Sequence, residues 1–111
     1  MPSEAIPFLR VTDADRACAW YERLGFEREW EHRFEPSLPS FVALARDHEA
    51  RLFLSEHSGD AHPNGLFYLR VPDVAAVAQA FDTEVVEQPW GPEVHLVDPD
   101  GNRVRVGTVR A

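Results

Sequence analysis

The chain has 111 residues, of which 44% are hydrophobic, and its 19 acidic and 11 basic residues give a formal net charge of −8. This length suits one domain with one modest core, and the composition is that of a folded chain rather than a disordered one. The acidic balance argues against a nucleic acid as partner, because phosphate binding needs a basic surface. It suits a cationic ligand better, although an acidic surface also serves solubility alone.

The first half of the chain begins with a short β-rich run, and a helix follows it. Apolar residues recur at helical spacing over residues 14–21. Thr12 or Asp13 can cap the start of this helix, and Gly25 can end it. Three strand-like runs come next, at residues 26–34, 41–45 and 51–55.

The second half repeats this order after a linker at residues 57–65. The segment FLRVTDADRACAWYE (residues 8–22) aligns without gaps with YLRVPDVAAVAQAFD (residues 68–82). Asp73 can cap the second helix, and the letters DPDGN at residues 98–102 are typical of a turn. The later strand-like runs lie at residues 83–87, 93–98 and 103–109.

The sequence therefore predicts an α+β fold with two βαβββ modules, at about residues 5–56 and 65–110, in a single domain over residues 1–111. We expect the modules to form a concave, partly closed mixed sheet with the helices on the outside. Strand side chains alternate between the two faces of a sheet. The residues expected to face the cleft or its rim are Ile6, Phe8, Arg10, Leu66, Tyr68, Arg70, Arg103 and Arg105.

Two features of the sequence bear on location. The N-terminus has no basic start followed by a long apolar run, so we expect no secretory signal, and no apolar stretch reaches the length that spans a membrane. The single cysteine, Cys18, allows no internal disulfide and falls on the apolar stripe of the first helix, where we expect it to pack. These features predict a cytoplasmic protein without a membrane partner.

The repeated βαβββ unit that ends in DPDGN resembles the vicinal oxygen chelate superfamily, which includes glyoxalases, extradiol dioxygenases, fosfomycin-resistance enzymes and bleomycin resistance proteins. The segment DADRACAWYERLGFE (residues 13–27) is similar to the first helix and the following strand entry of that superfamily. The letters QPWG at residues 88–91, shortly before DPDGN, resemble the bleomycin resistance branch. The resemblance covers nearly the whole chain.

This resemblance implies a metal site in the enzymes of the superfamily, and it places the four ligand positions at Ile6, Phe53, Leu66 and Arg105. Ile, Phe and Leu side chains offer no donor atom, and arginine stays protonated in proteins. A divalent metal needs several donors in fixed geometry. We therefore expect no metal, no cofactor and no catalytic residue, and hence a protein that is not an enzyme.

The resemblance also implies a groove between two subunits in which aromatic side chains stack on the flat rings of a drug. The expected ligand-binding residues are Trp30, Phe34, Phe41, Phe53, Tyr68, Trp90, His95 and Arg105. For each aromatic residue the alternative is ordinary core or interface packing, and for His95 it is a structural hydrogen bond. The arginines either pair with acids such as Glu93 and Asp98 or line a pocket for an anionic or carbonyl-rich ligand.

We therefore expect a homodimeric, glyoxalase-like binding protein that confers antibiotic resistance by drug sequestration. Its expected ligand is a bleomycin-type or related aromatic and cationic natural product, held without any bond being made or broken. The alternative is a metal-dependent lyase or dioxygenase of the same superfamily with an atypical site. A third reading is a sensor or accessory subunit that lacks drug-scale affinity.

Overall fold

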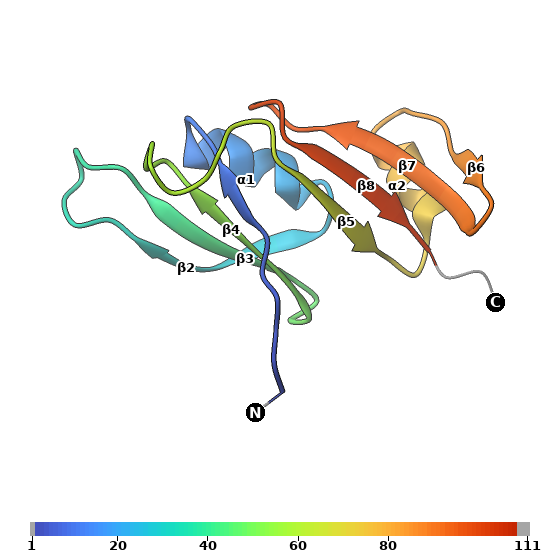
Figure 1. The fold of residues 1–111 in the computed structure, drawn as a ribbon, viewed down its shortest axis with the longest axis horizontal. Coiled ribbons are helices and arrows are strands. Elements are labelled where there is room, and N and C mark those ends of the chain that lie inside the picture. The colour runs from blue at the N-terminus through green and yellow to red at the C-terminus, as the bar shows by residue number, and fades with distance from the viewer. Residues whose placement is uncertain (1, 109–111) are drawn as a thin grey trace.

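The computed structural model describes residues 2–108 and contains two βαβββ modules in chain order (Figure 1). The first module consists of β1 (Phe8–Arg10), α1 (Ala14–Glu22), β2 (Phe26–His32), β3 (Phe41–Arg46) and β4 (Ala50–Ser55). The second consists of β5 (Leu66–Arg70), α2 (Val74–Ala80), β6 (Val86–Gln88), β7 (Gly91–Val97) and β8 (Arg103–Gly107). The predicted α+β class and element order are confirmed.

Each module builds a four-stranded mixed sheet, and the two sheets share one topology. The strand orders are β1-β4-β3-β2 and β5-β8-β7-β6. In each sheet the first strand runs parallel to the last strand of its module, and the other pairs are antiparallel. The helix between the first and second strands supplies the crossover that a parallel pair requires.

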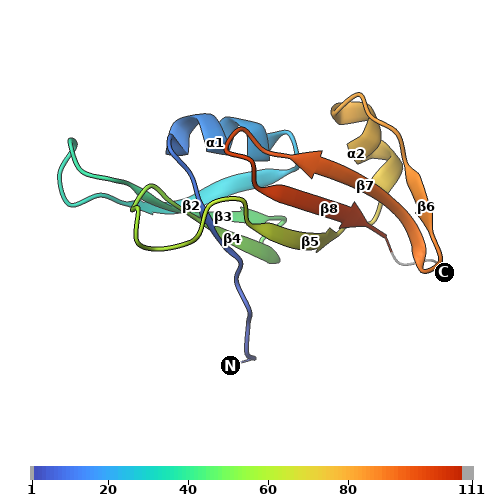
Figure 2. The same ribbon diagram turned by 45° about the horizontal axis from the view of Figure 1, so that its top comes forward.

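The helices cover one side of the sheets and leave the other side open (Figure 2). Helix α1 contacts β2, β3 and β4, and α2 contacts β7 and β8. The side chains that point toward the helices, such as Leu9, Val94 and Val104, are buried. Cys18 is buried among them, as predicted. The side chains between these positions form the open faces, on which the candidate site lies.

Both helices begin at the predicted aspartates. The Asp13 carboxylate accepts a hydrogen bond from the Arg16 amide at 3.1 Å, and Asp73 accepts one from the Ala76 amide at 3.2 Å. Of the two predicted caps of α1, Asp13 therefore fills the role, while the Thr12 hydroxyl donates to Asp100. Each bond satisfies one of the free N–H groups of a first helical turn.

The DPDGN turn joins the two modules. Tyr21 donates a buried hydrogen bond of 2.8 Å to Asp98, and the Asn102 side chain donates one of 2.9 Å to the Arg10 carbonyl. The Thr12 amide donates to Asp100 at 3.0 Å. The turn thus binds the end of β1, the residue before the N-cap of α1, and Tyr21 in the last turn of α1.

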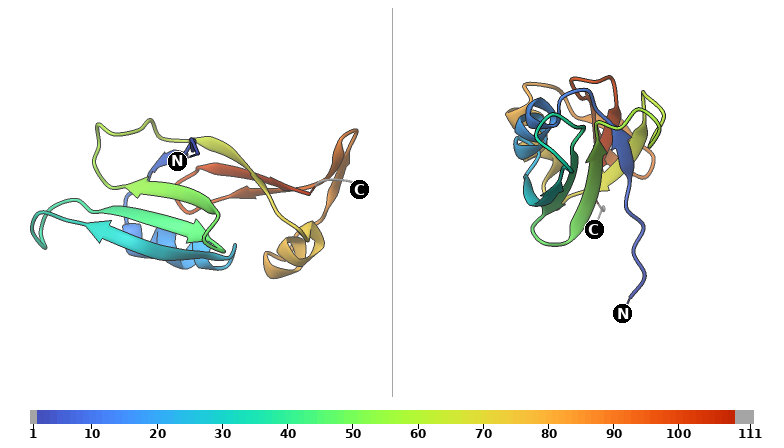
Figure 3. Two further views of the ribbon diagram at one scale, coloured as in Figure 1. Left: turned by 90° about the horizontal axis from the view of Figure 1, so that it is seen from below. Right: turned by 90° about the vertical axis from the view of Figure 1, so that its left-hand side faces the viewer.

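The molecule is elongated, because the modules lie end to end (Figure 3). Its extents are 47 × 34 × 21 Å and its radius of gyration is 14.4 Å, against about 13 Å for a compact domain of this length. None of the helices within residues 2–108 is long and apolar enough to cross a membrane.

Several strand limits differ from the prediction. Strand β2 ends at His32 instead of residue 34, because its pairing with β3 ends at Phe41. Strand β6 starts later than predicted, since the Thr83 amide still bonds to the Ala78 carbonyl at the end of α2. Strand β7 begins at Gly91, two residues earlier than predicted. Val109, which the sequence assigned to the last strand, lies outside the described residues.

Candidate ligand-binding site

The open face of the first sheet carries a cluster of aromatic rings, which we call the aromatic face: Phe8, Trp30, Phe41 and Phe53. Trp30 and Phe41 stack with ring centroids 5.5 Å apart and an interplanar angle of 13°. Phe41 meets Phe8 and Phe53 edge-on, at 5.1 and 5.2 Å. The predicted site residues Trp30, Phe41 and Phe53 are therefore brought together.

Strand register explains why these rings meet. Phe8 pairs with Phe53, and Ala43 lies between Phe53 and Trp30 in the same row across the sheet. The small Ala43 side chain is fully buried, which leaves room for the neighbouring rings to close over it. Trp30 nevertheless remains 49% exposed. An apolar cluster open to solvent is typical of a binding surface rather than of a core.

A cavity of about 510 Å³ adjoins the aromatic face. Its lining residues are Trp30, Glu31, His32, Phe41, His57 and Asp60. His57 and Asp60 come from the linker between the modules, and Ser55 fixes the Asp60 carboxylate with a hydrogen bond of 2.6 Å. The cavity is shallow and open to solvent, and it combines a stacked aromatic pair with Asp60 and with Glu31, which is already paired with Arg28 and Arg33.

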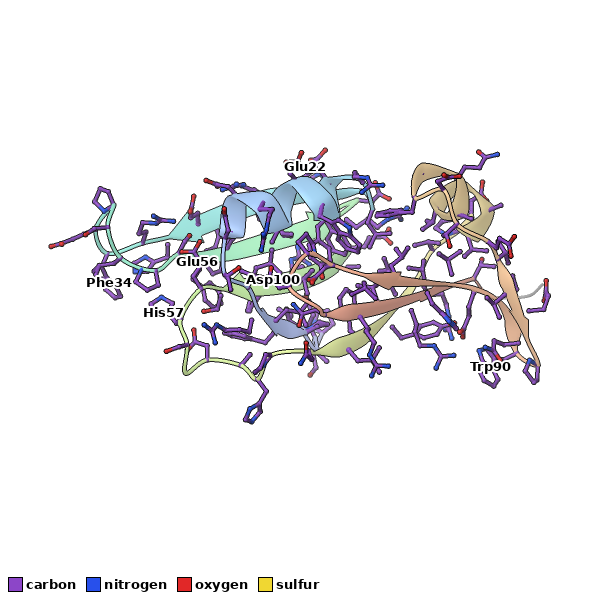
Figure 4. The ribbon with its side chains drawn as sticks, turned by 90° about the horizontal axis from the view of Figure 1, so that it is seen from above. Glu22, Phe34, Glu56, His57, Trp90 and Asp100 are labelled. Atoms are coloured by element: carbon purple, nitrogen blue, oxygen red, sulfur yellow. The ribbon has the colours of Figure 1, made fainter. Side chains whose placement is uncertain are left out.

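Phe34 does not join the aromatic face. It lies in the connection after β2, is 74% exposed, and meets His32 edge-on at 4.5 Å. It lines a different cavity with Asp15, Glu31 and Arg33. Figure 4 shows Phe34 and His57 near one end of the molecule and Trp90 at the opposite end. The predicted residues therefore do not form one groove within a single chain.

The remaining four predicted residues gather around one buried carboxylate on the open face of the second sheet, and we call this group the Glu93 cluster. Glu93 is 0% exposed. It accepts hydrogen bonds from Trp90 Nε1 at 2.5 Å, from Arg105 Nε at 3.1 Å and Nη2 at 2.5 Å, and it pairs with His95 Nε2 at 2.9 Å. Tyr68 completes the group.

Tyr68 reaches Glu93 only because residue 107 is a glycine. Tyr68, Arg105 and His95 form one row across β5, β8 and β7. Glu93 lies in the next row, opposite Gly107. A Cβ atom at Gly107 would collide with the Tyr68 hydroxyl. The missing side chain thus opens the path along which the phenol crosses β8.

The cluster keeps Glu93 ionised. Burial alone would raise the pKa of this carboxyl, but the hydrogen bonds from Trp90, Arg105, His95 and Tyr68 together lower it to about 2. Burial, followed by the hydrogen bond to Glu93, raises the pKa of Tyr68 above its ordinary value. At neutral pH the cluster therefore holds a carboxylate, a guanidinium and a neutral phenol.

The residues at the four superfamily metal positions do not suit a metal ion. Ile6, Leu66 and Phe53 carry no donor atom, and the Arg105 guanidinium is already paired with Glu93. Within residues 2–108, no three or more His, Cys, Asp or Glu side chains gather closely enough to hold a metal ion.

Sequence reasoning singled out Tyr68, Trp90, His95 and Arg105 as ligand-binding residues but missed the carboxylate at their centre. Glu93 entered only as one possible partner of an arginine. The available signal was the alternation of Glu93 and His95 on one strand, three residues after Trp90. The contributions of His57 and Asp60 to the cavity carried no comparable signal, because they depend on the path of the linker.

Comparisons with known proteins agree with this architecture. The family described as "Glyoxalase superfamily protein" matches residues 2–110. No curated protein matches the chain. Among solved structures, a bleomycin resistance determinant encoded on the transposon Tn5 is 24% identical, covers 99% of this chain and 100% of its own, and has a TM-score of 0.78.

Two further structures show the range of functions in this fold. A bleomycin-binding protein complexed with bleomycin is 25% identical, with a TM-score of 0.76 and coverage of 98% of this chain and 100% of that one. A lactoylglutathione lyase from Agrobacterium tumefaciens is 22% identical, with a TM-score of 0.72 and coverage of 96% and 94%. A shared fold therefore does not choose between binding and catalysis.

Proposed function

Because this chain belongs to the glyoxalase superfamily, we propose that it is a non-catalytic binding protein that sequesters a bleomycin-type or related aromatic antibiotic. Sequestration lowers the free drug concentration by mass action and makes or breaks no bond. The proposed binding residues are the eight that the sequence singled out: Trp30, Phe34, Phe41, Phe53, Tyr68, Trp90, His95 and Arg105. Among the known structures of this fold are bleomycin-binding proteins.

The observation that carries the proposal is the aromatic face with its adjoining cavity. The exposed Trp30 ring stacks on the half-buried Phe41, and the pair offers a flat apolar surface to a planar ligand. Each stacked aromatic pair adds about 0.5–1.5 kcal/mol beyond the burial of area. Asp60 at the cavity suits a cationic substituent, because its carboxylate accepts from the neutral Ser55 hydroxyl, whereas Glu31 is already paired with Arg28 and Arg33.

We further propose that two chains form the groove together. Phe34 and Trp90 lie at opposite ends of one chain (Figure 4), so one compact ligand cannot touch both within a monomer. A two-fold dimer that places the end of one chain beside the opposite end of its partner brings them together and produces two equal grooves. It would also cover the exposed aromatic rings.

The competing function is a metal-dependent lyase or dioxygenase with an atypical site. A lactoylglutathione lyase is among the known structures that share this fold. The donor chemistry opposes it, because three of the four expected ligand positions have hydrocarbon side chains and the fourth is Arg105. Elemental analysis of protein purified without chelators separates the two functions, since about one tightly bound ion per chain supports the enzyme.

The decisive experiment titrates the protein with metal-free and copper-loaded bleomycin and follows tryptophan fluorescence. The three tryptophans give matched variants, because Trp30 and Trp90 lie on the open faces while Trp20, in helix α1, packs on Tyr21 and Phe81. We expect saturable quenching with one drug per chain at sub-micromolar concentration. Trp30→Leu and Trp90→Ala should each weaken binding at least tenfold, and Trp20→Phe should leave it unchanged.

Two outcomes would count against sequestration. If neither form of bleomycin changes the emission, bleomycin is not the ligand, and a panel of other aromatic antibiotics must give saturable binding for the proposal to stand. If Trp20→Phe weakens binding as much as Trp30→Leu does, the quenching does not report on the aromatic face.

A further inference from the structure

The open face of the second sheet has the opposite charge from the rest of the molecule. On strands β5, β7 and β8, the side chains that point away from the helix include Arg70, Arg103 and Arg105, against the single acid Glu93. This face has a formal excess of two positive charges, with His95 neutral, in a chain whose net charge is −8. A positive region in an acidic protein requires a physical reason.

Glu93 cannot serve as the binding group for a cation. It is fully buried, and Oε1 already contacts Arg105 and His95 while Oε2 accepts from Trp90. The carboxylate is therefore used to hold the four side chains around it. What the cluster presents to solvent is the outer side of those groups.

The exposed groups of Trp90 and Arg105 are planar, and both are held in place by their bonds to Glu93. The Trp90 ring is 59% exposed although its Nε1 is bonded to Glu93. Arg105 uses Nε and Nη2 in its bonds to Glu93, and Nη1 takes no part in them. A guanidinium and an aromatic ring that are held before the ligand arrives lose little side-chain entropy on binding.

Arg103 adds a second cation to the same strand face. It lies two residues before Arg105 on β8, is exposed, and within residues 2–108 it forms no salt bridge. Arg70 on β5 is likewise exposed and forms no salt bridge with a described residue. Both retain their donors for a ligand.

We infer that the open face of the second sheet is a subsite for a planar aromatic group that carries an anionic substituent such as a carboxylate. The ring stacks on Trp90, and the anion pairs with Arg105 and Arg103, whose forked donors match a carboxylate. This inference goes beyond the proposed function, because it adds a positively charged subsite on the second sheet to the acidic cavity beside Trp30 on the first sheet. It holds whether or not the ligand is bleomycin.

Two probes of equal shape test the inference directly. These are 1-naphthoate, which is anionic, and 1-naphthalenemethanol, its neutral counterpart. Their affinities are measured by calorimetry, and the indole N–H resonance of Trp90, assigned with Trp90→Phe, reports where they bind. We expect naphthoate to bind at least tenfold more tightly than the alcohol, to shift the Trp90 resonance, and to weaken with added salt.

Variants identify the cations involved. Arg103→Gln removes a charge that forms no salt bridge with residues 2–108, so the fold should survive, and naphthoate affinity should fall about three- to tenfold. Arg105→Gln should lower it further, and it also removes the two hydrogen bonds that Arg105 donates to Glu93. Arg28→Gln is the matched control, because Arg28 pairs with Asp15 on the helix side of the first sheet, and it should leave the affinity unchanged.

The inference fails if naphthoate and the alcohol bind equally, if Arg28→Gln weakens naphthoate as much as Arg103→Gln does, or if the Trp90 resonance does not move. The bleomycin titration tests the proposed sequestration independently of this inference. Quenching by bleomycin without naphthoate binding overturns the anionic subsite alone, whereas naphthoate binding without any effect of an antibiotic overturns the proposed sequestration alone.

Discussion

At the scale of single residues, Glu93 organises the second open face. A buried carboxylate is costly unless it is paired and hydrogen-bonded. Here, Trp90, Tyr68, His95 and Arg105 provide that compensation. Each of the four side chains is fixed by its bond to Glu93. The groups that stabilise the buried carboxylate are therefore the same groups that we propose to contact the ligand.

This arrangement predicts a pH effect on stability. The folded pKa of Glu93 is about 2, below the ordinary value of 4.5, so between these values the unfolded chain binds more protons than the folded one. The stabilisation by Glu93 is therefore present above pH 4.5 and is lost as the pH falls toward 2. We expect the free energy of unfolding of wild type to fall more steeply over this window than that of Glu93→Gln.

Urea unfolding at a series of pH values from 7 to 3 measures this difference. Other carboxyls with lowered pKa values, such as Asp15, are common to both proteins, so the difference between the two curves isolates residue 93. Parallel curves would show that the charge of Glu93 contributes nothing to stability.

At the scale of the elements, alternation and capping were readable from sequence. The aspartates at 13 and 73 cap the helices as predicted, and the alternation of Arg103 and Arg105 with valines correctly assigns them to the face away from the helix. What could not be read were contacts between strands and loops. The rings that close over Ala43, and the linker that brings Asp60 to Trp30, depend on register and chain path.

The crossing of β8 by Tyr68 yields a prediction at this scale. Gly107→Ala places a methyl group where the Tyr68 hydroxyl lies, so Tyr68 must leave Glu93. We expect a loss of about 1–3 kcal/mol in the free energy of unfolding, as for other overpacked sites. In a Tyr68→Ala background the same change should hardly alter the free energy of unfolding, because the hydroxyl with which the methyl group collides is absent.

A double-mutant cycle of these two changes, followed by urea unfolding, measures the coupling. If Gly107→Ala lowers the free energy of unfolding equally in both backgrounds, the glycine is needed for the backbone conformation of β8 and not for the position of Tyr68.

At the scale of the whole molecule, the two open faces differ in chemistry, and no element within residues 2–108 covers either of them. One carries exposed rings and an adjoining acidic cavity, and the other carries arginines around a buried acid. The elongated shape, 47 Å in its longest dimension, separates Phe34 from Trp90 (Figure 4). A ligand with a cationic end and an anionic aromatic end would match the two faces if a second chain set them opposite each other.

Sedimentation equilibrium tests the assembly on which that match depends. We expect a mass about twice the 12.6 kDa of one chain, because a dimer buries the aromatic rings that a monomer exposes. Phe8→Glu places a charge among these rings and should shift the equilibrium toward monomer. Glu22→Lys, an exposed change on α1, should not. A monomeric wild type would contradict the shared groove and confine each face to its own ligand.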